Sequence, residues 1–172
     1  MKKIFFGVLL LLTFFNLKAI EGDSITYNSK SILEWSDFKM SPDINDSLNV
    51  YLDLTIATFT KKINVLWGTI TVESYAGIIR DLSWVKPQYK SQQLLDYVQL
   101  KYEIANYFAK KSEKEINRKK INAGFTKRIS NIIESYIDAM NTTLKEYDIE
   151  TNFGRNADIM NRWKDKLNNG EI

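Results

Sequence analysis

The sequence predicts an α+β fold, in which a small antiparallel sheet of about three or four strands precedes three helices. Apolar and polar residues alternate over residues 50–56, as in a half-buried strand. After Pro87 the apolar period changes from two residues to about 3.6, the period of an α-helix. Neither an internal repeat nor a linker rich in proline or glycine interrupts the chain, so we expect a single domain.

The amino terminus has the pattern of a secretory signal peptide. Two lysines precede an apolar run over residues 4–15, and a polar stretch then ends at the small residue Ala19. The run is too short for a transmembrane helix, which needs about 20 apolar residues. We therefore expect residues 1–19 to be a signal peptide and residues 20–172 to form one exported domain, periplasmic or extracellular, without a transmembrane segment. Because the chain has no cysteine, a bacterial exported protein is favoured over a eukaryotic secreted one.

The charge of the expected mature chain is balanced. The whole chain has 24 Lys and Arg against 21 Asp and Glu, and three of the lysines lie in the expected signal peptide. Removing these three leaves 21 positive and 21 negative side chains. The sequence therefore argues against nucleic acid as a partner, since nucleic-acid-binding domains carry a strong positive charge.

The composition also limits metal binding, because the chain has neither histidine nor cysteine. The remaining oxygen ligands favour calcium or magnesium over zinc. The segment "SPDINDSLN" groups candidate calcium ligands, namely Asp43, Asn45, Asp46 and Ser47. It lacks the glycine and the distal glutamate of a calcium-binding loop between two helices. We expect a polar turn there, and no metal or cofactor in the protein.

The first part of the expected domain contains the strands. Residues 24–47 form an irregular lead-in with one short helical or turn segment at "ILEWSDFK". The first strand follows at Val50. Residues 63–67 and 69–75 are rich in β-branched and aromatic side chains, and each is predicted to form a further strand.

The second part contains the helices. Residues 90–121 are predicted to form a long helix, which Gly124 separates from a second. Its charged run at residues 110–120 contains interspersed glutamates and is interpreted as a solvated face. The second helix has one apolar stripe, consisting of Phe125, Ile129, Ile132, Ile133, Tyr136, Ile137, Met140, Leu144 and Tyr147. A loop, "ETNFGRN", then leads to a last helix with Ile159, Trp163 and Leu167 on one face.

Lys101 breaks the apolar pattern of the first long helix. At about 100° per residue, it lies at the centre of the apolar half, among Leu94, Tyr97, Ala105 and Phe108. Its stem could cover apolar surface while the ammonium reaches water. Alternatively, Lys101 points into a cleft, where burial of the charge requires a carboxylate partner. The candidate partners are Glu150, Asp148 and Glu73.

Four segments resemble a known family when read in order along the chain. "LLDYVQLKYEIA" is similar to the active-site helix of bacterial secreted proteins that are predicted zinc-dependent proteases, catalogued as domain of unknown function 922. That helix has the pattern Leu-Leu-x-His-Glu-Gln-x-His-Phe-Asp-Ile-Ala-Glu, matched here at Leu94, Leu95, Gln99, Ile104 and Ala105. The segments "LEWSDFKMSP", "SWV" and "YDIETNFG" resemble other conserved blocks of the family. The resemblance implies a zincin-like arrangement of sheet and helices.

The residues that the family uses for zinc and catalysis are replaced in this chain. Tyr97 and Lys101 stand at the two histidine positions of the helix, Val98 at the glutamate position, and Phe153 at the third, downstream histidine. The resemblance therefore implies a non-catalytic pseudo-enzyme with a vestigial metal site, which binds a peptide, a protein or an envelope component. Two alternatives stay open. One is an enzyme that uses Lys101 as a nucleophile or base, and the other is a purely structural envelope protein with the cleft filled.

Overall fold

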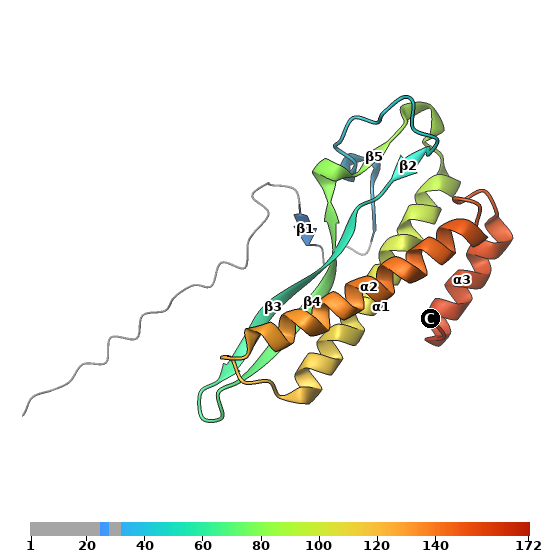
Figure 1. Cartoon of the computed structure of the whole chain (residues 1–172). Coiled ribbons are helices and arrows are strands. Elements are labelled where there is room, and N and C mark those ends of the chain that lie inside the picture. The colour runs from blue at the N-terminus through green and yellow to red at the C-terminus, as the bar shows by residue number, and fades with distance from the viewer. Residues whose placement is uncertain (1–24, 28–31) are drawn as a thin grey trace, which may run out of the picture.

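A computed structural model describes residues 25–27 and 32–172 of the chain. The expected signal peptide, residues 1–19, lies outside the described residues. Figure 1 shows the predicted α+β order, with antiparallel strands first and three helices after them. The long helices lie along the elongated β-hairpin that forms most of the sheet.

The strands form two antiparallel groups. β3 (Leu54–Asn64) and β4 (Thr69–Ile79) make the long hairpin. β1 (Ile25–Tyr27) adds to the other side of β4, opposite Gly77–Ile79, which gives the order β1-β4-β3. β2 (Val50–Tyr51) and β5 (Trp84–Val85) form a separate pair. Short 3₁₀ helices occur at Trp35–Asp37, Arg80–Leu82 and Pro87–Tyr89.

Three strand predictions were wrong in detail. Residues 25–27, predicted to belong to an irregular lead-in, form β1. The alternating run at residues 50–56 is divided between β2 and β3 around Asp53, whose N–H donates to Ser83 Oγ at 3.0 Å rather than to a strand. The strand predicted at residues 63–67 is mostly a turn, because β3 already ends at Asn64. The Asn64 side chain accepts hydrogen bonds from the N–H groups of Leu66 and Trp67, which closes the turn.

All three predicted helices are present, the first within about two residues of its predicted bounds, 90–121, which is the usual uncertainty of a helix end. They are α1 (Gln92–Lys119), α2 (Thr126–Glu150) and α3 (Ala157–Asn169), and Gly124 lies between α1 and α2 as expected. Phe125 does not belong to the buried stripe of α2, because it precedes the helix and is exposed. Among the described residues, no helix is both long enough and apolar enough to cross a bilayer.

One edge of β4 is covered by α1 instead of by a strand. β1 pairs with β4 only at residues 77–79, so the N–H groups of Val72, Ser74 and Ala76 have no strand partner. Side chains of α1 accept their hydrogen bonds: Asn117 from Val72 at 2.8 Å, Glu113 from Ser74 at 2.9 Å, and Asn106 from Ala76 at 3.4 Å. The Asn117 amide also donates to the Val72 carbonyl at 2.9 Å. The helix thus covers an edge that would otherwise be open to pairing with another chain.

The prediction that the charged run at residues 110–120 is a solvated face was therefore wrong in part. Glu113 and Asn117 face β4, while Lys110 and Lys119 form ion pairs within the helix, with Glu113 and Glu115 respectively. The spacing of four residues between Glu113 and Asn117 puts both on the same side of α1.

The core lies between α1, the sheet and α2. Val98, Ile104 and Ala105 of α1 and Met140 and Tyr147 of α2 are fully buried within one apolar cluster. A second, smaller cluster packs α1 and α2 near the hairpin turn and contains Val72, Ile116, Ile121, Ile129 and Ile132. This packing fixes α1 against the sheet and α2 against α1.

Asn117→Ala should lower the free energy of unfolding by about 2 kcal/mol, because it leaves the buried N–H and C=O of Val72 without partners. Urea denaturation measures this change. Asn131→Ala, on the exposed face of α2, is the control and should cost less than about 0.5 kcal/mol. An equal loss in both variants would show that α1 does not depend on the β4 edge.

Candidate functional site

The candidate site is centred on the carboxylate of Asp148, in the last turns of α2. The Tyr97 hydroxyl donates to Asp148 Oδ1, and Lys101 Nζ lies 2.8 Å from Asp148 Oδ2. Tyr97 and Lys101 are one helical turn apart on α1, so both point toward the same part of α2. The structure thus joins two of the four positions singled out from the sequence through a single carboxylate.

This network is largely buried. The side chains of Lys101 and Asp148 are 12% and 22% exposed, and Tyr97 is buried. Burial, and then the negative charge of Asp148, raise the pKa of the Tyr97 phenol. Tyr97 therefore stays protonated and acts as a donor. The Asp148 carboxylate neutralises the Lys101 ammonium, which explains how a lysine can occupy the apolar half of α1.

Asp148 is the partner of Lys101, whereas the other two candidates are engaged elsewhere. Glu150 accepts a hydrogen bond from Trp163 Nε1 at 2.8 Å. It is two residues beyond Asp148, about 200° further around α2, and so faces α3. Glu73 is on β4, and its carboxylate lies 3.6 Å from Lys61 Nζ. Glu150 and Glu73 were therefore wrong as partners of Lys101.

Aromatic rings connect the site to all three helices. The rings of Tyr97 and Tyr147 are stacked with centroids 5.3 Å apart, and Tyr147 meets Trp163 edge-on at 5.5 Å. The buried Tyr147 hydroxyl donates to the Tyr97 carbonyl at 3.3 Å. Such contacts between rings add to the stability gained by burial. These contacts fix the position of the α1 turn that carries Tyr97 relative to α2.

The loop after α2 places Phe153 next to this network. Asn152, Phe153 and Gly154 have consecutive left-handed conformations, with φ of 49°, 54° and 81°. The Phe153 N–H donates to the Asp148 carbonyl at 2.8 Å, and the Gln93 amide donates to the Gly154 carbonyl at 2.9 Å. A Cβ at position 154 would lie 2.6 Å from Tyr97 Cγ, so this close approach needs glycine.

Two hollows lie beside Phe153, which borders both and is 42% exposed. One, of about 230 Å³, is also lined by Tyr97. The other, of about 300 Å³, is also lined by Lys101 and Asp148. The β2 strand passes between them, with Val50 in the first lining and Tyr51 in the second. Phe153 therefore shares one hollow with Tyr97 and the other with Lys101.

Val98 lies apart from Tyr97, Lys101 and Phe153. It is fully buried in the main core cluster and lines neither hollow. The position that the resemblance assigns to a catalytic glutamate thus faces the core in this chain.

Sequence reasoning missed other residues that line the larger hollow. Asp53, Asn141 and Lys145 border it together with Lys101 and Asp148. Burial raises the pKa of the Asp53 carboxyl, although a hydrogen bond from the Leu54 backbone opposes this rise. The signal for Asp53 was present in the sequence, since Tyr51 and Asp53 alternate with the buried Leu52 and Leu54 and so face the opposite side.

The donor set at this site does not fit zinc. Structural and catalytic zinc is held by imidazole, thiolate and carboxylate groups, and here the helix positions supply a phenol and an ammonium already bound to a carboxylate. Across residues 25–27 and 32–172 there is no cluster of three or more Asp, Glu, His or Cys side chains that could hold a metal ion.

The segment considered for calcium forms a polar turn. Asp43 and Asp46 accept hydrogen bonds from the N–H groups of Asn45 and Leu48. The Lys86 ammonium donates to the carbonyl of Asp46 at 2.5 Å, so a cationic side chain already occupies this turn.

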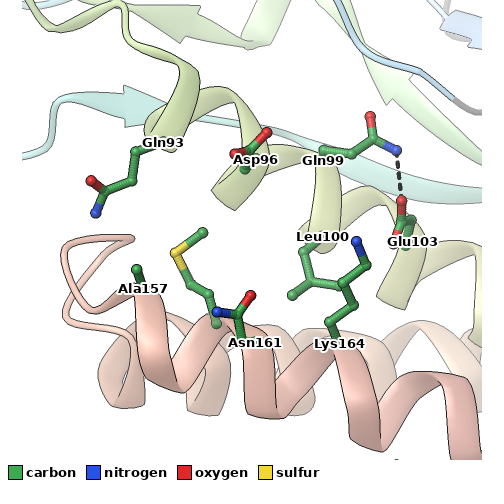
Figure 2. A pocket seen from close by; sticks show the side chains of 9 residues that line it. Gln93, Asp96, Gln99, Leu100, Glu103, Ala157, Asn161 and Lys164 are labelled. Carbon is green, nitrogen blue, oxygen red and sulfur yellow. Dashed lines mark hydrogen bonds between the residues drawn. The ribbon is translucent and has the colours of Figure 1, made fainter.

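A third hollow, of about 370 Å³, lies between α1 and α3 (Figure 2). It is separate from the Asp148 site. Figure 2 shows Gln93, Asp96, Gln99 and Glu103 on the α1 side and Asn161 and Lys164 on the α3 side. The Gln99 amide donates to Glu103 at 3.0 Å and accepts from the Leu33 N–H at 2.8 Å. These amide contacts tie α1 to the lead-in segment, which is a structural role.

Gly154→Ala should destabilise the protein by about 3 kcal/mol. The left-handed conformation with a Cβ costs about 1 kcal/mol, and overpacking against Tyr97 costs about 2 kcal/mol more. Gly170→Ala is the matched control, because Gly170 has a similar φ of 71° and nothing within 4 Å of the added Cβ. Thermal or urea unfolding would measure both. Similar losses would mean that the loop is not packed tightly on Tyr97.

Comparisons with known proteins do not identify a family for this chain. No family model matches it, no curated protein matches it in sequence, and no solved structure matches its fold. The resemblance to the predicted zinc-dependent proteases therefore rests on the four sequence segments alone.

Proposed function

We infer that the protein is an exported, non-catalytic relative of the predicted zinc-dependent proteases, and that it binds extended peptide segments beside Phe153. One observation carries this proposal: the two side chains at the helix histidine positions, Tyr97 and Lys101, are both bonded to the carboxylate of Asp148. A zinc ion would need side chains with free lone pairs at these positions, whereas Tyr97 and Lys101 both donate hydrogen bonds to Asp148. α1 packs on the sheet, and the loop that contains Phe153 is bound to α1 by the hydrogen bond from Gln93 to the Gly154 carbonyl. This packing is compatible with a zincin-like arrangement.

The state of each polar group in the network supports a non-catalytic role. A general base must lie within hydrogen-bond reach of the proton that it takes from the substrate, and each oxygen of the partly buried Asp148 is already engaged, one with Tyr97 and the other with Lys101. Tyr97 is held protonated by burial. A lysine nucleophile needs a neutral amine, but Lys101 forms a 2.8 Å ion pair. This ion pair weighs against an enzyme based on Lys101.

The two hollows support a binding role over a purely structural one. In a structural protein with a filled cleft, the side chains at the replaced positions would leave no space. Here volumes of about 230 and 300 Å³ remain on the two sides of Phe153. The smaller lies below, and the larger at the lower limit of, the range of about 300–1,000 Å³ that is usual for ligand pockets. Adjacent small hollows around an exposed aromatic ring suit successive side chains of a peptide, with Phe153 as the anchor.

The linings indicate the kind of peptide. Lys145 borders the larger hollow and Arg155 the smaller, and both side chains are exposed. Apolar side chains, including Leu144 and Ile149, line the larger hollow beside them. Asp53 and Asp148 balance Lys101 and Lys145 around the larger hollow, whereas Arg155 is the charged residue in the lining of the smaller one. We therefore expect a preference for peptides that place an apolar residue at the larger hollow and an acidic residue at the smaller.

Selection from a displayed library of random peptides tests this proposal. Selected peptides should bind the Phe153→Asn variant at least tenfold more weakly than the protein, because the anchor ring is lost. Asparagine is chosen since it tolerates the left-handed backbone. Tyr89→Asn, at a comparably exposed aromatic residue outside both hollows, is the control and should leave the dissociation constant unchanged. Isothermal titration calorimetry would measure the affinities.

Two results would contradict the proposal. One is that no peptide is enriched relative to an unrelated target. The other is that the enriched peptides bind the protein and its Phe153→Asn variant equally well. Turnover of a bound peptide would likewise contradict the non-catalytic assignment: its loss in the Lys101→Met variant would indicate an enzyme based on Lys101, and its survival would indicate another catalytic group.

A further inference from the structure

One end of the molecule exposes four large apolar side chains, which we call the apolar tip: Val65, Leu66, Trp67 and Phe125. They are 91%, 90%, 76% and 65% exposed. The first three occupy the β3–β4 turn, and Phe125 lies in the connection between α1 and α2. Figure 1 shows both loops at the same end of the molecule. Clustered apolar exposure of this kind marks an interaction site more often than isolated apolar residues do.

Backbone contacts join the two loops of the apolar tip. The Ala123 N–H donates to the Gly68 carbonyl at 2.8 Å, and the Ile70 N–H donates to the Ile121 carbonyl at 2.9 Å. A Cβ at position 68 would lie 2.6 Å from the Asn122 side chain, and Gly68 has a φ of 62°. The α1–α2 connection is thus packed directly against the hairpin turn.

The turn itself presents the apolar side chains outward. Asn64 Oδ1 accepts from the N–H groups of Leu66 at 3.1 Å and Trp67 at 3.3 Å. These bonds satisfy the turn backbone internally, so the side chains of both residues are free to project away from the protein. The conformation is set by local hydrogen bonds and does not require another part of the chain to cover these side chains.

The surroundings of the apolar tip are positively charged. The two segments that build it, residues 59–72 and 116–133, contain no Asp or Glu. They contain seven cationic residues, namely Lys61, Lys62, Arg118, Lys119, Lys120, Lys127 and Arg128. Lys61 pairs with Glu73 and Lys119 with Glu115, while the other five have no ion pair within the part of the chain that the structure describes. This end is therefore positive in a chain that is nearly neutral beyond residue 19.

We propose that the apolar tip docks on an anionic lipid bilayer, with Trp67 in the headgroup region and Leu66 among the upper acyl chains. Tryptophan favours the membrane interface, where its ring is apolar and its N–H stays hydrated. Lysine and arginine near the surface are attracted to anionic headgroups. The apolar tip combines both features, and it is independent of the Asp148 site and of the function proposed for it.

The shape of the apolar tip favours a bilayer over a protein partner. A stable protein interface buries about 800 Å² on each side and needs complementary surfaces. Here three of the four apolar residues stand on the β3–β4 turn and the fourth on the connection packed beside it, at one end of the molecule, which offers a narrow contact. A bilayer accepts such a tip without a matching surface, and its anionic headgroups complement the surrounding cations.

Trp67 fluorescence tests the proposal in the full chain. The protein is mixed with vesicles of equal parts phosphatidylglycerol and brominated phosphatidylcholine, and the spectrum of the Trp67→Phe variant is subtracted to isolate Trp67. We expect the Trp67 emission to shift to shorter wavelength and to be quenched by the brominated chains. Vesicles of brominated phosphatidylcholine alone should quench it much less. Residues 1–19 are present in every variant, so any binding that they contribute is the same throughout.

Matched variants separate the roles of charge and apolar surface. Lys62→Gln, Lys127→Gln and Arg128→Gln combined should lose most of the quenching, whereas Lys39→Gln, Lys90→Gln and Arg162→Gln combined should retain it. The six residues are all exposed, and each set removes two lysines and one arginine. Leu66→Ser should also lose most of the quenching, and Ile44→Ser, at a comparably exposed apolar residue, should retain it.

Three results would overturn the proposal. The first is a Trp67 emission that is the same with anionic vesicles as in buffer. The second is equal quenching in neutral and anionic vesicles, and the third is equal quenching in the two charge variants. Burial of Trp67 by a protein partner, with no quenching by either kind of vesicle, would assign the apolar tip to a protein interface instead.

Discussion

The open edge of β4 is the constraint on which the arrangement of this protein depends. β1 pairs with only the last part of β4, so three N–H groups of the central strand need other partners. Asn106, Glu113 and Asn117 of α1 provide them. These bonds fix both the position of α1 along the hairpin and its rotation about its own axis. Because a helix is rigid over this length, fixing one face also decides where every other face of α1 points.

The rotation of α1 places Tyr97 and Lys101 opposite the end of α2. Asp148 contacts both, and its carboxylate offsets the free-energy cost of burying the Lys101 ammonium on the apolar half of the helix. The same end of α2 continues into the left-handed turn that places Phe153 beside these residues. The opposite end of α1 leads to the connection that packs on the β3–β4 turn. One helix thus links the Asp148 site with the distant apolar tip.

The sequence predicted the periodic elements well and the partners of polar residues poorly. The three helices and the break at Gly124 follow from apolar spacing, and Lys101 was identified because it violates that spacing. Spacing shows which side of a helix a residue is on, but it does not show what faces that side. For this reason Glu150 and Glu73 were considered beside Asp148 as partners of Lys101.

The remaining errors have the same origin. The charge pattern predicts a solvated face at residues 110–120, whereas Glu113 and Asn117 of this run form hydrogen bonds with β4. Residues 63–67 have the side chains of a strand and yet form a turn, since the hydrogen bonds of Asn64 and the conformation of Gly68 outweigh β propensity. Both outcomes depend on tertiary contacts that no local pattern contains.

The central claim is that Tyr97, Lys101 and Phe153 occupy the places of three zinc-binding histidines. Zinc titration of a variant with Tyr97→His, Lys101→His and Phe153→His tests it most directly. Val98 is left unchanged, because a glutamate there would be a buried charge without a partner. Our account predicts that the folded variant binds one zinc ion, while Phe153→His alone binds none. If the folded triple variant takes up no more zinc than Phe153→His alone, these positions were never a metal site and the proposed relationship is wrong.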